Sequence, residues 1–271
     1  GSRYLCHTKT MTESVAQRLD IENRLRHAID HNEFVLHYQP KINVQSGKFV
    51  GAEALIRWND PQSGLVAPGR FIPILEETGL IYEVGRWALG QAISDFLRWH
   101  AIGLEAFRIA VNVSPLQLRD PAFVDDVRHY LSVDPAAAHG LELELTESMI
   151  MQNLNQSIAS LETIRSLGVT VAIDDFGTGF SSLGYLSKLP VDTLKIDRSF
   201  IIEMTGSAEG LALVTTIINL AHGLNLKVVA EGVETVEQHR LLKLLKCDEV
   251  QGFLLSKPLP VDIFEATYLR K

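Results

Sequence analysis

The stretch VTVAIDD, residues 169–175, is an apolar run that ends on two adjacent carboxylates. Five further stretches have the same form and end on an acid, an amide or a segment that contains a lysine. They are FVGAE (49–53), IAVN (109–112), LELE (141–144), LKID (194–197) and VVAE (228–231). Polar groups that end separate parallel strands meet at the carboxyl edge of a sheet, where α/β folds carry their chemistry. The pattern therefore predicts an α/β fold with one polar site at that edge.

Strand-like and helix-like segments alternate through the chain. We predict strands at residues 34–39, 49–56, 108–113, 141–146, 169–174, 193–197, 226–231 and 248–255. Helices are predicted at residues 69–78, 81–101, 118–131, 149–166, 207–223, 234–245 and 261–268. Glycine and proline mark many of the joints. Eight strands with intervening helices predict a (β/α)8 barrel as one domain, with a doubly wound open sheet as the alternative.

The first residues predict a helix from about Thr12 to His31, packed on the domain or linking it to an upstream one. Gly1 and Ser2 have the form of a cloning remnant. We therefore assign residues 1–20 to this remnant and the start of a linker helix, and residues 21–271 to a single domain. His27 lies four residues before His31, but without a third ligand nearby we favour a structural role over zinc binding.

Composition is that of an ordinary globular domain, with 46% hydrophobic and 21% charged residues. A net charge of −8 argues against a nucleic-acid polymer or an anionic membrane surface as partner. No apolar run is long enough to span a bilayer, so we expect no membrane contact by this domain. Two cysteines without a CxxC motif fit a cytoplasmic location. Anchoring of the whole protein to the inner membrane stays open.

The polar strand ends are rich in hard oxygen ligands, namely Glu53, Asn112, Glu144, Asp174 and Asp175. At an effective dielectric of about 20, two carboxylates ~5 Å apart repel by about 3 kcal/mol, so their convergence predicts bound cations. No histidine falls at these strand ends, and an all-oxygen set prefers Mg²⁺ or Mn²⁺ over zinc. Each acid alone also fits a solvated strand end or a helix cap. Only the set as a whole predicts a metal site.

Asp174 and Asp175 are adjacent, and adjacent side chains of a strand point to opposite faces. Both reach one site only where the strand breaks, and the FGTG segment at 176–179 supplies that break. Asp174 could then bridge two cations while Asp175 holds the second, as in two-metal phosphoryl enzymes. The alternative is an Asx-turn that opens a Gly-rich loop. The loop at 177–182 lacks the ending of a P-loop, so we expect a mobile lid or a dimer contact.

Other charged residues near the strand ends have two interpretations each. Lys195 could orient a nucleophilic water molecule that Glu231 also contacts, or it could neutralise the acids. Because nearby carboxylates favour the charged form of lysine, Lys195 is poorly suited to act as a base. Arg57 could clamp a phosphate oxygen or form a surface ion pair. Glu147 and Glu234 could anchor loops over the site or complement helix dipoles.

The string EALIRW at residues 53–58 introduces a resemblance to a known family. The accompanying motifs are YQP (38–40), VNVS (111–114), ELTE (144–147), DDFGTG (174–179), LKID (194–197), AEGVET (230–235) and QGF (251–253). In combination and order they are similar to the motifs of bacterial EAL-domain cyclic-di-GMP phosphodiesterases. The likeness runs from about residue 20 to the C-terminus. These motifs show no departure from the family pattern, whereas receptors that bind the dinucleotide without cutting it usually have eroded motifs.

The resemblance implies a modified TIM (β/α)8 barrel whose first strand runs antiparallel to the others. It implies hydrolysis of cyclic di-GMP to linear pGpG by water, with two Mg²⁺ or Mn²⁺ ions per site. It also implies a homodimer and an upstream GGDEF or sensory domain in the full-length protein. Two alternatives stay open: a catalytically silent cyclic-di-GMP receptor, and another metal-dependent barrel such as an enolase-like lyase with Lys195 as base.

The family's site residues carry over onto matching positions of this chain. The implied metal ligands are Glu53, Asn112, Glu144, Asp174, Asp175 and, directly or through water, Glu231. The implied catalytic residues are Lys195, which holds the attacking water, Glu231 and Glu53. Substrate contacts are implied for Gln39, Leu55, Arg57 and Gln251, the last of which supports the edge of the site. Glu147 would fix the loop after Asp175, and Glu234 would have a similar secondary role.

Overall fold

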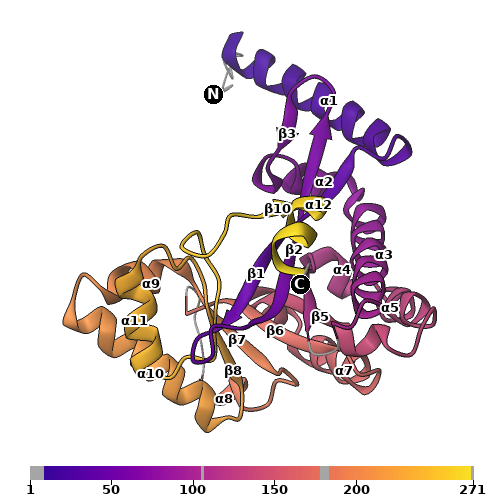
Figure 1. Ribbon diagram of the computed structural model, residues 1–271. Helices are drawn as coiled ribbons and strands as arrows, with labels where there is room; N and C mark the ends of the chain where they lie inside the picture. Colours follow the sequence, from indigo (N-terminus) through magenta and orange to yellow (C-terminus); the bar gives the residue numbers. More distant parts are fainter. Residues whose placement is uncertain (1–8, 105–106, 178–182, 270–271) are drawn as a thin grey trace, which may run out of the picture. The chain divides into compact units, whose positions relative to one another are not determined.

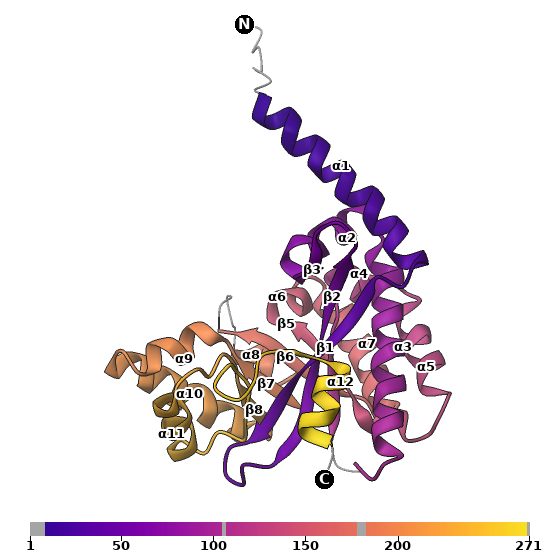
Figure 2. The same ribbon diagram turned by 45° about the horizontal axis from the view of Figure 1, so that its top comes forward.

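The computed structural model describes residues 9–104, 107–177 and 183–269, in two compact units. The smaller unit contains Gly1–Val35 and Ile56–Val84, and the larger contains Leu36–Leu55 and Gly85–Lys271. Their elements are drawn in Figure 1 and, turned by 45°, in Figure 2. The predicted cloning remnant lies outside the described residues.

All eight predicted strands are present, and two short ones, β3 and β10, are additional. The strands are β1 (Phe34–Asn43), β2 (Phe49–Asp60), β3 (Gly64–Val66), β4 (Arg108–Asn112), β5 (Leu141–Thr146), β6 (Thr170–Phe176), β7 (Thr193–Ile196), β8 (Lys227–Ala230), β9 (Glu249–Val250) and β10 (Leu259–Pro260). The last predicted strand, at 248–255, is much shorter than expected, because only Glu249–Val250 pairs as a strand there.

The strands form one sheet in the order β10-β1-β9-β8-β7-β6-β5-β4-β2-β3, and β1 also pairs with β2. That pairing closes eight of the described strands into a barrel. From β2 through β4 to β9 each neighbouring pair is parallel. In contrast, β1 is antiparallel to β9. The predicted TIM-like barrel with a reversed first strand is therefore confirmed, and the open doubly wound sheet is wrong.

The helices are α1 (Lys9–Asp30), α2 (Ile72–Thr78), α3 (Ile81–His100), α4 (Pro115–Arg119), α5 (Phe123–Leu131), α6 (Glu147–Gln152), α7 (Leu154–Ser166), α8 (Leu183–Leu186), α9 (Arg198–Met204), α10 (Ala208–Gly223), α11 (Val236–Leu244) and α12 (Val261–Phe264). Short helical turns are η1 (Pro68–Arg70), η2 (Ala137–Gly140) and a π-helical turn at Glu265–Leu269. None of the helices in the described ranges combines the length and apolar character needed to cross a lipid bilayer.

Two predicted helices are each divided into two α-helices. The helix predicted at 118–131 corresponds to α4 and α5, because Asp120 precedes Pro121 and takes an extended ψ of 121°. Residues before proline disfavour the helical region in this way. The helix predicted at 149–166 corresponds to α6 and α7, which are separated by the non-helical backbone of Asn153 (φ −146°, ψ 66°).

The helix α9 was not predicted, and it begins directly after β7. Asp197 caps it, because the Asp197 carboxylate accepts a 2.9 Å hydrogen bond from the backbone amide of Ser199. An aspartate at this position satisfies one of the otherwise unpaired amides of the first turn. The acid that ends the LKID stretch (194–197) is therefore a helix cap.

The strand β5 shows how the sequence builds the two faces of the barrel wall. Leu141, Leu143 and Leu145 are each 1% exposed, and α6 packs against this strand. Glu142 and Glu144 alternate with the leucines and face the interior, where both accept hydrogen bonds from a lysine of β1. Side chains two residues apart share a face of a strand, so alternation of leucine and glutamate gives an apolar outside and a charged inside. Figure 1 shows α7, α10 and α11 on the outside of the strands.

The smaller unit contains α1, α2, β3 and the outer parts of β1 and β2. Within it, Trp58 Nε1 donates a 3.0 Å hydrogen bond to Glu33 Oε2, and Arg24 Nη1 lies 2.5 Å from the buried Asp60 Oδ2. The Trp58 ring lies edge-on to Phe71, with ring centroids 6.3 Å apart. These contacts hold the helices of this unit on its strands.

Candidate active site at the carboxyl ends of the strands

Lys195 of β7 lies at the centre of a group of acids from neighbouring strands. Its Nζ atom is 2.5 Å from Glu231 Oε1 and 2.6 Å from Glu144 Oε2. The same atom is 3.2 Å from Asp174 Oδ1 and 3.8 Å from Glu53 Oε2. Lys195 and Glu144 are completely buried. Residues that are far apart in the sequence thus converge because all of them follow or end parallel strands of one barrel.

Amide side chains hold Glu53 on its other sides. Asn112 Nδ2 donates a 2.7 Å hydrogen bond to Glu53 Oε1, and Gln251 Nε2 donates a 2.6 Å hydrogen bond to Glu53 Oε2. Gln251 Nε2 also lies 2.9 Å from Gln39 Oε1. Because Asn112 donates through its nitrogen, its carbonyl oxygen is the atom that can ligate a cation. The structure thus adds Asn112, Gln251 and Gln39 to the same cluster.

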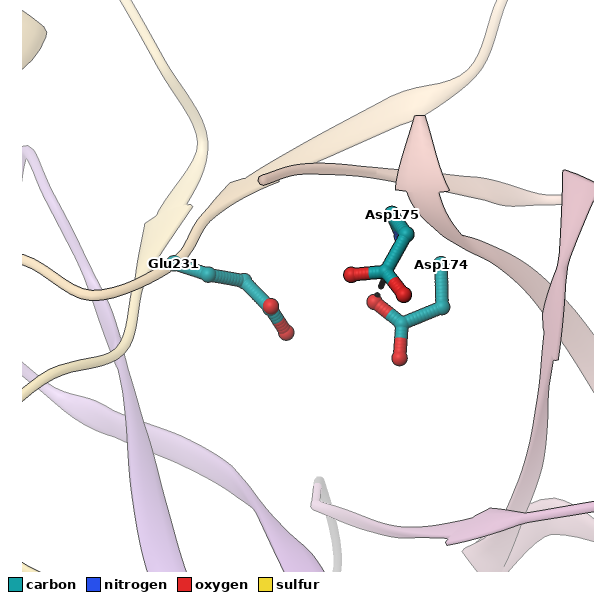
Figure 3. Close-up of side chains that lie close together, drawn as sticks. All are labelled: Asp174, Asp175 and Glu231. Atoms are coloured by element: carbon teal, nitrogen blue, oxygen red, sulfur yellow. Dashed lines mark hydrogen bonds between the residues drawn. The ribbon is translucent and has the colours of Figure 1, made fainter. Parts of the chain in front are cut away.

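Asp174 and Asp175 reach one site because β6 is irregular at that point. The pairing of β6 with β7 shifts register between Ile173 and Phe176, and Asp175 has a φ of 53°. A left-handed backbone costs a non-glycine residue roughly 1–2 kcal/mol, and such strain is typical of functional sites. In Figure 3 the two carboxylates lie next to each other, and Glu231 extends toward them. The irregularity therefore lies within β6, before its last residue Phe176, whereas the strand break was predicted in the FGTG segment at 176–179, of which 178–179 lie outside the described residues.

A divalent cation fits this set of donors. Asp174, Asp175 and Glu231 each offer one oxygen, and these oxygens lie within 4.8 Å of one another. Gln251 Oε1 is buried and has no hydrogen-bond partner among the described residues. Buried polar atoms normally have a partner, so this oxygen is an acceptor that a bound group can use. Carboxylate and amide oxygens favour Mg²⁺ or Mn²⁺.

The electrostatics of Glu144 and Lys195 keep both residues charged. Burial alone would raise the pKa of Glu144, but the ammonium groups of Lys195 and Lys41 outweigh it and lower this pKa to about 2. Burial alone would lower the pKa of Lys195, but Glu144, Glu231 and further acids raise it well above its usual value. A permanently charged lysine can orient a water molecule but cannot take a proton from it.

For Glu53, Glu231 and Asp175 the ionised form is disfavoured in the folded chain. Burial, followed by repulsion from Glu144, raises the pKa of Glu53. Burial is also the main cause that raises the pKa of Glu231 to about 8, although Lys195 opposes it. Burial and the neighbouring Asp174 raise the pKa of Asp175. One lysine is therefore not enough to neutralise these carboxylates, and added positive charge would stabilise all three in their ionised form.

The predicted substrate contacts lie in both units. Leu55 is half-buried and follows Glu53 by two residues on β2, so the two side chains share a strand face. Arg57 belongs to the smaller unit, where its Nη1 donates a 2.8 Å hydrogen bond to the carbonyl of Ile56. Their contacts with a substrate remain predictions.

The two predicted loop anchors differ in their surroundings. Glu147 is buried at the first position of α6. Glu234 is more exposed, and its Oε1 lies 2.8 Å from Arg198 Nη2 of α9. This ion pair ties the segment after β8 to α9 instead of reaching the acids. Residues 178–182 lie outside the described residues, so the expected lid or dimer contact there is untested.

Sequence reasoning missed Lys41, which contacts Glu144 of the site, and Glu142, which contacts Lys41. The two-residue spacing of strand side chains could have indicated both residues. Lys41 follows Gln39 by two residues on β1, so both side chains lie on the same face of the strand. Glu142 precedes Glu144 by two residues in the leucine-glutamate alternation of β5.

Comparison with known proteins identifies the family. Residues 22–258 match the sequence model of the EAL domain, and the chain therefore belongs to the EAL-domain family. Over 259 residues it is 43% identical to the bifunctional diguanylate cyclase/cyclic di-GMP phosphodiesterase MucR of Pseudomonas aeruginosa, covering 96% of this chain and 38% of MucR. Over 249 residues it is 45% identical to the cyclic di-GMP phosphodiesterase NbdA of the same species, covering 92% and 32%. The chain thus spans less than half the length of these relatives.

Solved structures agree in fold. The PaMucR phosphodiesterase in complex with c-di-GMP superimposes with a TM-score of 0.87 at 44% identity, covering 92% of this chain and 99% of that one. The EAL enzyme Bd1971, in a form bound to cAMP and cyclic-di-GMP, gives a TM-score of 0.87 at 35% identity, covering 93% and 69%. Both structures support the barrel assignment.

Proposed function

We propose that this chain hydrolyses one phosphodiester bond of cyclic di-GMP to give linear pGpG in a reaction that requires Mg²⁺ or Mn²⁺. The observation that carries this proposal is the group of five carboxylates around Lys195 in a member of the EAL-domain family. A relative with 44% identity is described as a phosphodiesterase in complex with c-di-GMP. An excess of buried carboxylates is suited to binding a phosphodiester only when cations accompany the substrate.

The proposed metal ligands are Glu53, Asn112, Glu144, Asp174 and Asp175, with Glu231 on a second ion directly or through water. When bound, two such ions polarise the phosphoryl oxygens and lower the pKa of a water molecule. The short span between the oxygens of Asp174, Asp175 and Glu231 supports this assignment.

Lys195 is proposed to hold the attacking water, which Glu231 shares. The lysine ammonium donates hydrogen bonds and stays protonated, so its contribution is orientation of the water and attraction of the phosphodiester charge. The same protonation disfavours the lyase alternative, because a lysine that removes a proton from carbon must be neutral.

Gln39, Leu55, Arg57 and Gln251 are the proposed substrate contacts, and Glu147 and Glu234 the proposed loop anchors. The hydrogen bond between Gln251 and Gln39 supports a shared position for these two amides at the edge of the site. The planar guanidinium of Arg57 is suited to a phosphate oxygen.

We also propose that the chain acts as a homodimer and as the cytoplasmic effector domain of a longer protein with an upstream GGDEF or sensory domain. Relatives that are two to three times longer support the second part. Equilibrium sedimentation of the purified chain, with and without cyclic di-GMP, tests the first part.

The decisive experiment is a turnover assay. Purified protein is incubated with cyclic di-GMP and Mg²⁺, Mn²⁺, Ca²⁺ or EDTA, and the products are separated by anion-exchange chromatography. We expect pGpG with Mg²⁺ or Mn²⁺ and none with EDTA. Calcium should support binding but little cleavage, because its larger and looser coordination shell positions the water poorly. Binding of cyclic di-GMP without turnover under every metal would instead support the silent receptor.

A further inference from the structure

Lys41 is a buried lysine that belongs to no part of the mechanism above. It lies on β1, the reversed strand, and its side chain is 4% exposed. Its Nζ atom is 2.9 Å from Glu142 Oε1 and 2.8 Å from Glu144 Oε1. Thr193 Oγ1 donates a 3.1 Å hydrogen bond to the other oxygen of Glu142. Lys41 is therefore held in place by β5 and, through Glu142, by β7.

The two oxygens of Glu144 are each bound by a different lysine. Lys41 contacts Oε1 at 2.8 Å, and Lys195 contacts Oε2 at 2.6 Å. Lys195 also contacts three other acids, so its position depends on how their charges are balanced. Among the ion pairs of the described residues, Lys41 takes part only in those with Glu142 and Glu144. Unlike Lys195, Lys41 thus contacts Glu144 without also contacting Glu53, Asp174 or Glu231.

Stability alone does not account for this arrangement. Burying a lysine between two acids contributes little net stability compared with apolar packing of the same volume. A glutamate side chain, however, has several rotatable bonds, and a second partner restricts the orientation of its carboxylate. Groups that orient metal ligands in this way strongly affect metal affinity.

We propose that Lys41 is a positioning residue for this site, which fixes the orientation of the Glu144 carboxylate and thereby the affinity for a divalent cation. Lys41 touches neither the substrate nor the reacting atoms. The part of this inference that concerns turnover rests on the proposed hydrolysis, and the part that concerns cation affinity rests only on the proposed metal ligands.

Although it is buried, Lys41 lines a cavity on the side of the barrel opposite to the acids around Lys195. A cavity of about 670 Å³ is lined by the strand starts, and Lys41, Glu142 and Thr193 are in its wall. Glu144 and Lys195 are not among its lining residues. A small molecule in this cavity can therefore reach the place of the Lys41 side chain without passing the acids, which allows chemical rescue.

The first test measures Mn²⁺ affinity by electron paramagnetic resonance of the free ion, together with kcat and KM for cyclic di-GMP. Lys41→Met should weaken Mn²⁺ binding roughly 10- to 100-fold and lower kcat at fixed Mn²⁺ by a similar factor, with KM for cyclic di-GMP unchanged. Lys41→Met/Glu142→Gln also removes the negative charge that would lose its ammonium partner, so it keeps the test valid if the single variant does not fold. Lys227→Met, in the wall of the same cavity, is the matched control and should change neither quantity.

The second test is rescue of Lys41→Ala, which leaves a gap that n-propylammonium matches in length and charge. Millimolar n-propylammonium should restore Mn²⁺ affinity at least several-fold, whereas n-propanol and sodium chloride should not. A structural role alone would not distinguish the amine from the alcohol.

Wild-type Mn²⁺ affinity in the folded double variant would overturn the proposal, as would equal rescue by n-propanol. Failure of every Lys41 variant to fold, even with n-propylammonium present, would make Lys41 a residue of the fold and would also overturn it. A wild-type protein that binds Mn²⁺ but leaves cyclic di-GMP intact would contradict the proposed function alone, because the affinity measurements would still decide the role of Lys41.

Discussion

The two ends of the barrel interior differ in their balance of charge. The acidic end contains five carboxylates and one lysine, namely Glu53, Glu144, Asp174, Asp175, Glu231 and Lys195. The balanced end, around the cavity at the strand starts, contains three acids and three cations, namely Glu142, Asp192, Glu249, Lys41, Arg108 and Lys227. Charged residues inside this barrel are therefore not in themselves a sign of function, whereas an excess of carboxylates over cationic side chains is.

The acids of the balanced end already have partners within the chain. Asp192 accepts hydrogen bonds from Arg165 Nη2 at 2.6 Å and from the backbone amide of Val171 at 3.0 Å. Glu249 lies 3.6 Å from Lys227. At the acidic end Lys195 serves four carboxylates, and of these four Glu144 is the one that Lys41 also contacts, so the remaining charge calls for cations from solution. The following predictions test this contrast.

The largest effect is expected for Glu53→Ala, which removes a proposed ligand at the acidic end. Loss of about 4 kcal/mol of transition-state stabilisation corresponds to roughly 1000-fold lower kcat/KM. The measurement is pGpG production at saturating Mn²⁺. Glu249→Gln at the balanced end is the matched control and should keep activity near that of the wild type. Substantial activity of the Glu53 variant would contradict the ligand assignment.

A smaller effect is expected on stability when cations are added. A Mg²⁺ or Mn²⁺ concentration of 100 times Kd should raise the free energy of unfolding by about 2.7 kcal/mol, because only the folded chain gathers the ligands. The rise is visible as a higher Tm in thermal denaturation. Asp175→Asn should reduce this rise, whereas Lys227→Met should leave it intact. An equal rise in both variants would mean that the ion binds elsewhere.

A further effect is expected on the pH dependence of the free energy of unfolding, measured with EDTA present so that no metal ion is bound. The pKa of Glu231 is about 8 in the folded chain against 4.5 for a free glutamate, so the folded state binds more protons between these values. Stability should therefore fall as pH rises from about 5 to 8, by an amount on the order of 3 kcal/mol. Urea unfolding at pH 5.5, 6.5 and 7.5 measures it. Glu231→Gln should flatten the curve, as should saturating Mg²⁺, and a stability that increases with pH would refute the sign.

The smallest effect is expected for Lys227→Met at the balanced end. The Lys227 side chain is 60% exposed and lies 3.6 Å from Glu249, so the ion pair is screened by solvent. We expect a change in the free energy of unfolding of less than about 0.5 kcal/mol, measured by urea denaturation, and unchanged turnover. A larger loss would show that charge balance at this end is also critical.

Local sequence patterns predicted most of the fold, because the strands that matter are short, apolar and regularly spaced. The strand predicted at 141–146 is present as β5 and contains Glu144, which lies beside Lys195 of β7 as the acid-ending stretches predicted. Helix boundaries were less accurate. The unpredicted α9 depends on the capping role of Asp197, an acid that the strand-end pattern had grouped with the others.

The contacts of the site could not be read from the sequence in the same way. The shift of register at Asp175 places two adjacent carboxylates together, and it arises from pairing between β6 and β7. Lys41 was overlooked because it ends no acid-ending stretch and its partners Glu142 and Glu144 are more than 100 residues away in the chain.

The amino-acid sequence by itself predicted the alternation of strands and helices, the polar residues that end the strands and a set of hard oxygen donors. These follow from periodicity and side-chain chemistry, which are local properties. Only the tertiary structure decided which charges are balanced and which are not, because that depends on distances between strands brought together by closure of the sheet. Closure makes one lysine serve four acids at the acidic end, and it joins Lys41 to Glu144 from the other side.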